Sequence, residues 1–159
     1  MKIFHGGTEI VKSPRIISSY TGRDFGIGFY TTDIMEQAIK WAKRQALYRR
    51  KDSAILNIYE FDNDVSDLST KVFNDYSIEW LDFVINCRGN LNYKHTYDLV
   101  TGKIANDNVG ETIQAVIDGL TSKDFALTKI VFMEANNQIC FSTQKALNHI
   151  KFVSSRKVN

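Results

Sequence analysis

Two periods in the spacing of hydrophobic residues predict strands and helices along the chain. Short segments rich in β-branched and aromatic residues are typical of strands. Six segments have this character: Lys2 to His5, Phe29 to Thr32, Ala54 to Phe61, Tyr97 to Val100, Gln138 to Ser142 and Lys151 to Ser155. The stretch between the first two, which contains the single proline, is expected to be a loop.

Apolar residues spaced three or four positions apart predict helices between these strands. The first helix is expected to begin at Asp33, which with Glu36 has the spacing of an N-terminal cap, and to run to about residue 50. Further helices are expected around Ile78 to Ile85, Ile113 to Leu120 and Ala146 to Ile150. The segment from Ser122 to Met133 fits a helix or a strand. Because strands and helices do not alternate regularly, the pattern predicts an α+β domain rather than a doubly wound sheet.

Composition places the chain in the class of single globular domains. It has 159 residues, of which 43% are hydrophobic and 12% aromatic, enough for one well-packed core. No linker or internal repeat divides it, so residues 1–159 are expected to form one domain. The formal charge of +2 is too small to require a nucleic acid or an anionic membrane as partner.

The same features indicate a cytoplasmic protein that does not enter membranes. No apolar run approaches the roughly 20 residues that span a bilayer, and the charged, glycine-containing start from Met1 to Thr8 does not favour a cleaved leader. Cys87 and Cys140 lie far apart and lack a CxxC or a histidine at ligand spacing. Neither a disulfide framework nor a metal site is therefore expected.

Several common kinds of catalytic site find no support in the sequence. His95 and His149 have no acidic or thiol neighbour at ligand spacing, and no GxSxG pattern is present. Scattered carboxylates cannot be paired from sequence alone. They include Glu9, Asp24, Asp98, Asp107 and Glu134.

Two glycine-containing segments are better candidates for a binding site. His5 ends the first predicted strand and precedes Gly6 and Gly7, so that a ring nitrogen can donate to a ligand hydroxyl beside exposed backbone amides. Gly26 and Gly28 precede the second strand, where they permit positive φ or a close approach of the backbone to a ligand. A tight turn that merely begins a strand explains the second pattern as well.

Three motifs together resemble the ADP-ribosyltransferase superfamily. They are FHGG (Phe4 to Gly7), DFGIGFYTTD (Asp24 to Asp33) with the following AIKWA (Ala38 to Ala42), and NNQICFST (Asn136 to Thr143). More narrowly, the chain is similar to a bacterial family of small proteins assigned to that superfamily, in which YDLVTGKIANDNV (Tyr97 to Val109) also has a counterpart. The resemblance covers nearly the whole chain. It implies a split antiparallel β-sandwich with flanking helices, of the His-Tyr-Glu branch.

The resemblance also implies residues that bind NAD as a substrate. His5 matches the histidine that hydrogen-bonds a ribose hydroxyl, and Gly6 the glycine whose backbone holds the nicotinamide carboxamide. Tyr30 and Trp41 match the two aromatic walls around the nicotinamide ring. The implied cofactor-binding set also contains Asp24, Phe25, Gly28 and Ala38. For Ala38 and Trp41, which are three residues apart, two core positions on one helix face are the alternative interpretation.

Gln138 departs from the family pattern, because it stands where the catalytic glutamate is found. With His5 and Tyr30 it completes the implied catalytic set. A glutamine keeps a hydrogen bond to the ribose but supplies no negative charge to the oxocarbenium-like transition state. Activity is therefore modest, or Asp24 or Glu134 compensates, or the target supplies the base. By the same reasoning Gln138→Glu is expected to retain or raise NAD cleavage.

The implied function is transfer of ADP-ribose to a protein or nucleic-acid acceptor. Asn136 matches a position that addresses the acceptor, although an asparagine in a surface turn is the alternative. An unregulated enzyme of this kind would harm its own cell, so a toxin or effector with a cognate antitoxin or immunity protein is expected. The competing hypothesis is a non-catalytic NAD- or nucleotide-binding module. Its basic run from Lys40 to Lys51 would contact a nucleic acid or an acidic protein, unless that run is simply a solvated helix end.

Overall fold

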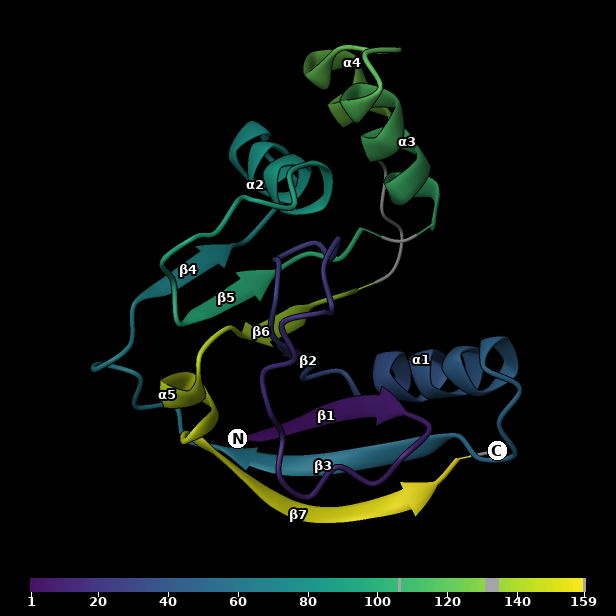
Figure 1. Ribbon diagram of the computed structural model, residues 1–159, viewed down its shortest axis with the longest axis vertical. Coiled ribbons are helices and arrows are strands. Elements are labelled where there is room, and N and C mark those ends of the chain that lie inside the picture. Colours follow the sequence, from purple (N-terminus) through teal and green to yellow (C-terminus); the bar gives the residue numbers. More distant parts are fainter. Residues whose placement is uncertain (106, 131–134, 159) are drawn as a thin grey trace.

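A computed structural model describes residues 1–105, 107–130 and 135–158, and its strands form two sheets (Figure 1). The first sheet is antiparallel, in the order β1 (Lys2–Gly7), β3 (Ile55–Phe61) and β7 (Ile150–Lys157). The second has the order β2 (Phe29–Thr31), β6 (Gln138–Phe141), β5 (Leu99–Gly102) and β4 (Thr70–Phe73). Only the β4–β5 pair of these ladders is parallel, so both sheets are mainly antiparallel.

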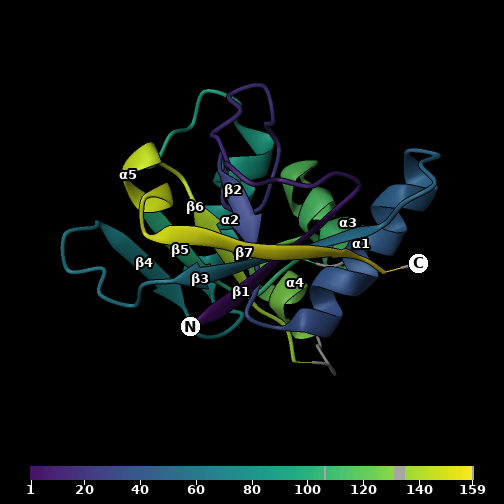
Figure 2. The ribbon, with the colours of Figure 1, turned by 90° about the horizontal axis from the view of Figure 1, so that it is seen from below.

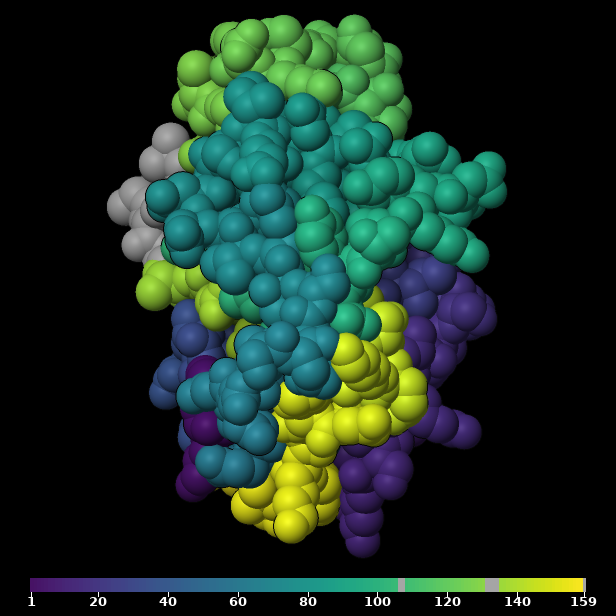
Figure 3. All heavy atoms as spheres, turned by 90° about the vertical axis from the view of Figure 1, so that its left-hand side faces the viewer, coloured from purple at the N-terminus to yellow at the C-terminus, as the bar shows by residue number. Residues whose placement is uncertain are grey.

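Five helices in the described part of the chain flank the sheets. They are α1 (Met35–Tyr48), α2 (Ile78–Gly89), α3 (Asp107–Ile117), α4 (Lys123–Lys129) and α5 (Gln144–Leu147). Seen from below, α1 lies near the C-terminus, and α5 and β4 lie at the opposite side (Figure 2). In the space-filling view, α3 and α4 form one end of the molecule, in green, and the yellow C-terminal segment lies toward the other (Figure 3). None of the helices within the described ranges has both the length and the apolar character needed to cross a membrane.

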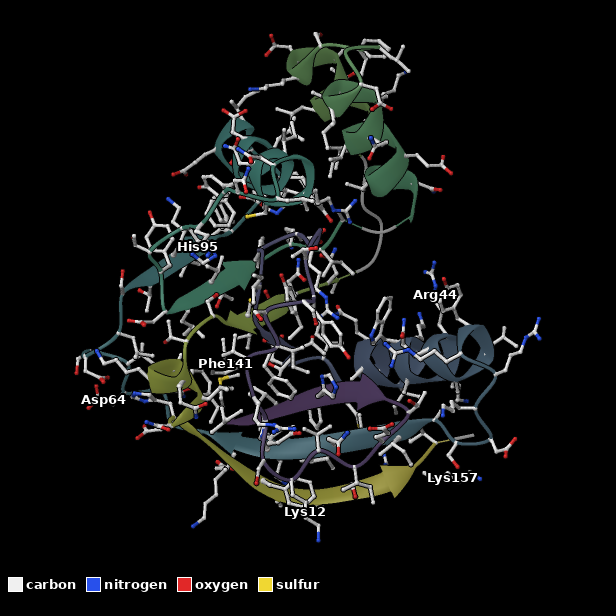
Figure 4. All side chains as sticks on the ribbon, viewed as in Figure 1. Lys12, Arg44, Asp64, His95, Phe141 and Lys157 are labelled. Atoms are coloured by element: carbon white, nitrogen blue, oxygen red, sulfur yellow. The ribbon has the colours of Figure 1, made fainter. Side chains whose placement is uncertain are left out.

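The alternation of side chains along the strands creates separate cores on the two faces of each sheet. Ile3 and Tyr59 of the first sheet pack with Phe29 and Phe141 of the second, and Figure 4 shows Phe141 between the two sheets. Phe4 points to the opposite face of the first sheet and packs with the α1 residue Ala38 and with Leu56 of β3. A third core lies between the far face of the second sheet and helices α2 to α4. It includes Phe25, Trp80, Val84, Val100, Ile113 and Cys140.

The predicted α+β class and the six predicted strands are confirmed, with differences that have local causes. Strand β4 was not predicted, because only Phe73 of its four residues is buried. The predicted strand from Tyr97 begins at Leu99 instead. Between Ser122 and Met133 the chain forms α4, and residues 131–133 lie outside the described ranges.

The predicted cap of the first helix is wrong. Helix α1 begins at Met35 and ends at Tyr48, and Ile34 is its N-cap without a side-chain bond. The Asp33 carboxylate instead accepts a hydrogen bond from Asn137 Nδ2 at 3.0 Å. Asp33 therefore ties the start of α1 to the segment that leads into β6.

Candidate functional site

A cavity of about 1350 Å³ opens where β1 and β2 separate. Phe4 of β1 forms a bridge with Thr32, the residue that follows β2: Phe4 N donates to Thr32 O at 2.8 Å and Thr32 N to Phe4 O at 2.9 Å. Beyond this bridge the cavity is walled by α1, by the loop between β1 and β2, and by Ile104, Ala105, Ala135, Asn136 and Gln138. It thus lies at the junction of the two sheets.

The predicted site residues come together in this cavity. Its lining includes His5, Gly6, Asp24, Gly28, Tyr30, Ala38, Trp41 and Gln138. Residues far apart in the sequence therefore line one cavity. Phe25 is the exception, because its side chain is 0% exposed and lies in the core against Phe73 and Phe83. The structure therefore does not bring the Phe25 side chain to the cavity.

His5 is held in one tautomer by the backbone of β2. Its Nδ1 lies 2.7 Å from the carbonyl oxygen of Tyr30, and since a carbonyl only accepts, Nδ1 carries the proton. The ring stacks on Phe29 with centroids 4.6 Å apart. Burial lowers the pKa of His5, the bond to Tyr30 opposes this effect, and the charge of Arg23 adds to it. The neutral ring therefore offers Nε2 as an acceptor, whereas donation to a ligand was expected from the sequence.

The position that a Cβ of Gly6 would occupy is directed toward α1, and the backbone groups of Gly6 are directed toward the cavity. A Cβ at this position would lie 2.0 Å from Ala38 O and 2.9 Å from Ala42 N, so β1 and α1 can approach only at a glycine. Backbone groups alternate between the two edges of an antiparallel strand, and those of Phe4 bond to β2. Two residues later the Gly6 N–H and C=O point to the same edge, where β2 has diverged. By this alternation neither group bonds to β3, and no hydrogen bond outside the ladders reaches either of them among the described residues.

Tyr30 is fixed by the turn that precedes its own strand. Its hydroxyl accepts from Phe25 N at 3.0 Å and donates to Gly26 O at 2.7 Å, and the positive φ of Gly26, 78°, makes this tight turn possible. Burial raises the pKa of Tyr30 well above 10, so the hydroxyl stays protonated. The Arg23 guanidinium lies over the Tyr30 ring, 5.3 Å from its centroid, and also 5.0 Å from the ring of Tyr20. A ligand that stacks on this face must displace Arg23.

Gly28 has a different role from Gly26. A Cβ on Gly28 would lie 2.4 Å from Cys140 Sγ and 2.8 Å from Phe141 O. The glycine therefore lets β2 pack closely against β6. The tight-turn interpretation of this pair of glycines is thus correct for Gly26, and close backbone approach, to β6 rather than to a ligand, explains Gly28.

Trp41 lies at the mouth of the cavity, not in the core. Its side chain is 50% exposed, whereas Ala38, one turn earlier, is buried against β1. Arg44 lies over the Trp41 ring, 5.8 Å from its centroid, and Figure 4 shows Arg44 on the side of α1 away from β1. The alternative of two core positions therefore holds for Ala38 and fails for Trp41.

Gln138 is part of a buried polar network. Its Nε2 donates to Asp24 Oδ2 at 3.0 Å and to the carbonyl oxygen of Lys103 at 3.1 Å. Asp24 Oδ2 also accepts from Ala105 N at 2.9 Å, and Asp24 Oδ1 accepts from Arg88 Nε at 2.7 Å with Arg88 Nη2 at 2.6 Å. Arg88 had no functional assignment from sequence, because nothing in the α2 pattern marks it and its partner is 64 residues away.

These bonds determine how the Gln138 amide is oriented. Both groups around Nε2 are acceptors, so the NH₂ must face them and Oε1 must face elsewhere. Within the described residues Oε1 has no protein partner, and Gln138 lines the cavity. Asp24, one of the two carboxylates expected to compensate for the missing glutamate, lies next to this amide. The other candidate, Glu134, lies outside the described residues.

Two further side chains hold the walls of the cavity, and one of them corrects an expectation. Asn136 is buried, and its Oδ1 accepts from Ile104 N at 2.9 Å, so it does not lie in a surface turn. Gln37 of α1 forms a pair of bonds with the backbone of Asn137, of 2.7 and 3.1 Å. These contacts fix the entry to β6 just before Gln138.

The loop after β1 is anchored by a buried asparagine that the sequence patterns did not identify. Asn57 of β3 is opposite His5 in the ladder, and its side chain accepts from Val11 N at 2.9 Å and donates to Glu9 O at 3.0 Å. Tyr59 adds a bond of 2.6 Å to Val11 O. A polar residue inside a strand of apolar neighbours was the available signal, since a buried amide needs partners.

The charge of the cavity favours an anionic ligand. Its lining contains seven basic residues and three acidic ones. The basic ones are Lys12, Arg15, Arg23, Lys40, Arg44, Arg49 and Arg88, and the acidic ones Glu9, Asp24 and Glu36. In residues 1–105, 107–130 and 135–158 there is no cluster of three or more His, Cys, Asp or Glu side chains that could hold a metal ion.

The two cysteines are not suited to nucleophilic chemistry. Both are buried free thiols, and burial raises the pKa of Cys87 to about 12 and that of Cys140 to about 11. A thiol with so high a pKa is not a thiolate near neutral pH. Chemistry in this cavity therefore depends on the ligand and on the neutral and charged groups described above.

Comparison with known proteins gives one family. A family model described as "Protein of unknown function (DUF3990)" matches residues 1–152, a range that contains every described residue of the cavity. No curated protein and no solved structure matches the chain.

Proposed function

This chain belongs to the DUF3990 family, and we propose that it is an NAD-dependent mono-ADP-ribosyltransferase. The observation that carries the proposal is the backbone of Gly6. The motif resemblance assigns its N–H and C=O to the nicotinamide carboxamide, and the two groups are unpaired and aimed into a cavity lined by His5, Tyr30, Trp41 and Gln138. The two sheets that diverge between β1 and β2 are compatible with the split β-sandwich of that superfamily.

Each wall of the cavity has a place in the proposed NAD complex. The carboxamide exchanges two hydrogen bonds with Gly6, and the neutral Nε2 of His5 accepts one from a ribose hydroxyl. The nicotinamide ring lies between Trp41 and Tyr30 after Arg23 has left the Tyr30 ring. The excess of basic residues stabilises the diphosphate.

The reaction breaks the bond between the nicotinamide nitrogen and the anomeric carbon of the ribose. The bonding electrons leave with neutral nicotinamide, positive charge grows on the ribose, and an acceptor nucleophile forms the new bond to the anomeric carbon. Gln138 Oε1 accepts a hydrogen bond from a ribose hydroxyl, and this bond strengthens as the charge develops. Because the Gln138 amide does not take up a proton, the proton of the nucleophile goes to a basic group of the acceptor or to water. Turnover is therefore modest.

The acceptor is a protein or a nucleic acid, and the biological role is that of a cytoplasmic toxin or effector. Uncontrolled consumption of NAD would harm the cell that makes the enzyme. A cognate antitoxin or immunity protein is therefore part of the proposal. These assignments rest on the resemblance, and the chemistry above does not depend on them.

Incubation with NAD labelled in its adenosine part, in the presence of a cell extract, tests the proposal. Wild type should release nicotinamide and label macromolecules, and His5→Ala should lose both activities. His149→Ala is the matched control, because His149 lies outside the cavity and contacts Asp67. Absence of nicotinamide release from wild type with several extracts would contradict the proposal.

One observation favours a second candidate, a non-catalytic NAD- or nucleotide-binding module. The Gln138 amide is held by Asp24 and Lys103, and no negative charge is available at Oε1. In that case calorimetry would detect NAD binding by wild type, and no nicotinamide would be released with any extract. Both candidates predict that His5→Ala weakens NAD binding, so the release of nicotinamide distinguishes them.

A further inference from the structure

The geometry points to Asp24 and Arg88 as positioning residues that orient the amide of Gln138 and select glutamine over glutamate at this position. The selection itself is a property of the folded protein. Only its consequence for NAD cleavage rests on the proposed function. The three side chains come from distant parts of the chain: Asp24 from the loop before β2, Arg88 from helix α2 and Gln138 from strand β6.

The network leaves no donor for a carboxylate at position 138. The two groups that face Gln138 Nε2, Asp24 Oδ2 and Lys103 O, are both acceptors. Asp24 is 8% exposed and Gln138 7% exposed, so water cannot solvate a second charge there fully. Arg88 is the cation of this network, and it bonds to the far oxygen of Asp24, Oδ1.

Gln138→Glu therefore replaces two favourable contacts by two unfavourable ones. One oxygen of the new carboxylate would lie against a carboxylate at about the present 3.0 Å and against a carbonyl at about 3.1 Å. A like charge so close and so buried disfavours ionisation strongly. The expectation from sequence, that Gln138→Glu retains or raises NAD cleavage, did not take these contacts into account.

An exchange of the two polar groups makes the inference testable. Asp24→Asn combined with Gln138→Glu keeps the number of heavy atoms and the single negative charge of the network. The new amide at position 24 can donate to the new carboxylate at position 138. The double variant should recover only part of the thermal stability lost in Gln138→Glu, because Ala105 N loses its carboxylate acceptor and the carbonyl of Lys103 still faces position 138.

We expect Asp24→Asn to change the midpoint of thermal unfolding in opposite directions in wild type and in the Gln138→Glu variant. In wild type, Asp24→Asn should lower the midpoint of thermal unfolding, because Arg88 loses its negatively charged partner and the NH₂ group of Asn replaces one of the two acceptor oxygens that serve Arg88 and Ala105. In protein that already carries Gln138→Glu, the same Asp24→Asn should raise it. Gln138→Glu alone should lower the midpoint by roughly 5 °C or more at pH 8, whereas Gln144→Glu, at an exposed position of α5, should change it by less than about 2 °C.

The pH dependence separates charge from packing. The introduced carboxyl has a raised pKa and becomes protonated in the fold as pH falls, so the loss caused by Gln138→Glu should be smaller at pH 5.5 than at pH 8. Burial raises the pKa of Tyr30 well above its usual value, that of Tyr76 and of Cys87 to about 12, and that of Cys140 to about 11, so these surrounding groups stay neutral over this range. Wild type and Gln144→Glu, measured at both pH values, correct for all other titrations.

Additive effects of the two substitutions would overturn the inference, as would equal losses at pH 8 and pH 5.5. If Gln138→Glu does not fold, Gln138→Met replaces it, since methionine has a similar length and no charge. Folding of the methionine variant then supports selection by charge, and failure of both variants contradicts it.

Nicotinamide release supplies the catalytic part of the test. Arg88→Lys, which keeps a cation beside Asp24, should retain more of the kcat of wild type than Arg88→Ala does, with little change in KM for NAD. Equal kcat in the two variants would contradict a positioning role of Arg88. Failure of wild type to release nicotinamide would remove the proposed function alone, because the reversal of sign in thermal unfolding needs no NAD.

Discussion

The two walls of the cavity are built by different means. On the β1 wall, Gly6 and His5 are positioned by the backbone, through the ladder with β3 and the bond from His5 to Tyr30 O. On the β6 wall, Gln138 is positioned by side chains, through Asp24 and Arg88. A backbone wall depends on close packing of the whole sheet, whereas a side-chain wall depends on a few charges. The comparison teaches that changes at the first wall disturb the packing of a whole sheet against α1, whereas changes at the second disturb one buried polar network.

The largest effect is expected from Gly6→Ala. Its new Cβ would lie 2.0 Å from Ala38 O, and the backbones of β1 and α1 must separate to admit it. Overpacking against backbone should lower the free energy of unfolding by about 3 kcal/mol or more, measured by urea denaturation. Gly7→Ala is the control, because its Cβ meets only the His5 ring, at 3.4 Å. Equal losses in the two variants would show that the β1 wall does not depend on this contact.

The next effect is expected on the β6 wall, from Arg88→Ala. Removal of the guanidinium leaves the Asp24 carboxylate buried without its cation. Loss of one partner of a buried pair costs about 3–5 kcal/mol, and because the Arg88 side chain is 27% exposed we expect about 2 kcal/mol from urea denaturation. Arg88→Lys should lose less. A loss as large for Lys123→Ala, whose pair with Asp82 lies on the surface, would contradict the distinction between buried and exposed pairs.

Trp41→Ala should separate ligand binding from folding. Half of this side chain is exposed at the mouth of the cavity, so its removal should change the free energy of unfolding by less than about 0.5 kcal/mol. Loss of an aromatic wall should weaken NAD binding by about 1 kcal/mol, or roughly fivefold, in calorimetric titration. Tyr48→Ala, an exposed aromatic residue farther along α1, should leave the affinity unchanged. Unchanged affinity in Trp41→Ala would remove Trp41 from the proposed site.

The smallest effect is a pH dependence that comes from His5. Burial lowers its pKa in the folded protein, so the unfolded chain binds the proton first as pH falls. The free energy of unfolding due to His5 is therefore fully present above about pH 6.5 and decreases as pH falls below that value. His5→Gln should show a weaker decrease than wild type between pH 7.5 and pH 5 in urea denaturation. The same slope in both proteins would contradict a buried neutral His5.

Local patterns in the sequence were sufficient for six of the strands and for the motifs of the β1 wall, but not for β4 or for the start of α1. The glycine after His5 and the strand before Trp41 are short motifs whose geometry is set by neighbouring residues. The β6 wall was only half predictable, because Gln138 and Asp24 lie in motifs but their contact joins residues 114 positions apart. Nothing in the sequence pattern indicated the contact of Arg88 with Asp24, since one arginine in an amphipathic helix has no preferred distant partner. Phe25 and Asp33 were misassigned for a related reason, because a motif does not show which side chain turns into the core.

Gly6 both packs against α1 and presents its backbone groups to the cavity, and this has a consequence for genetic screens. One of its two Cα hydrogens faces α1 and its amide groups face the cavity, so no side chain can be added there without disturbing both. A random library screened for loss of function would return, at position 6, variants that do not accumulate in the cell. At position 41, by contrast, we expect abundant, well-folded protein with reduced activity. The ratio of protein level to activity, read across the library, would thus map which parts of the cavity serve the fold and which serve the ligand.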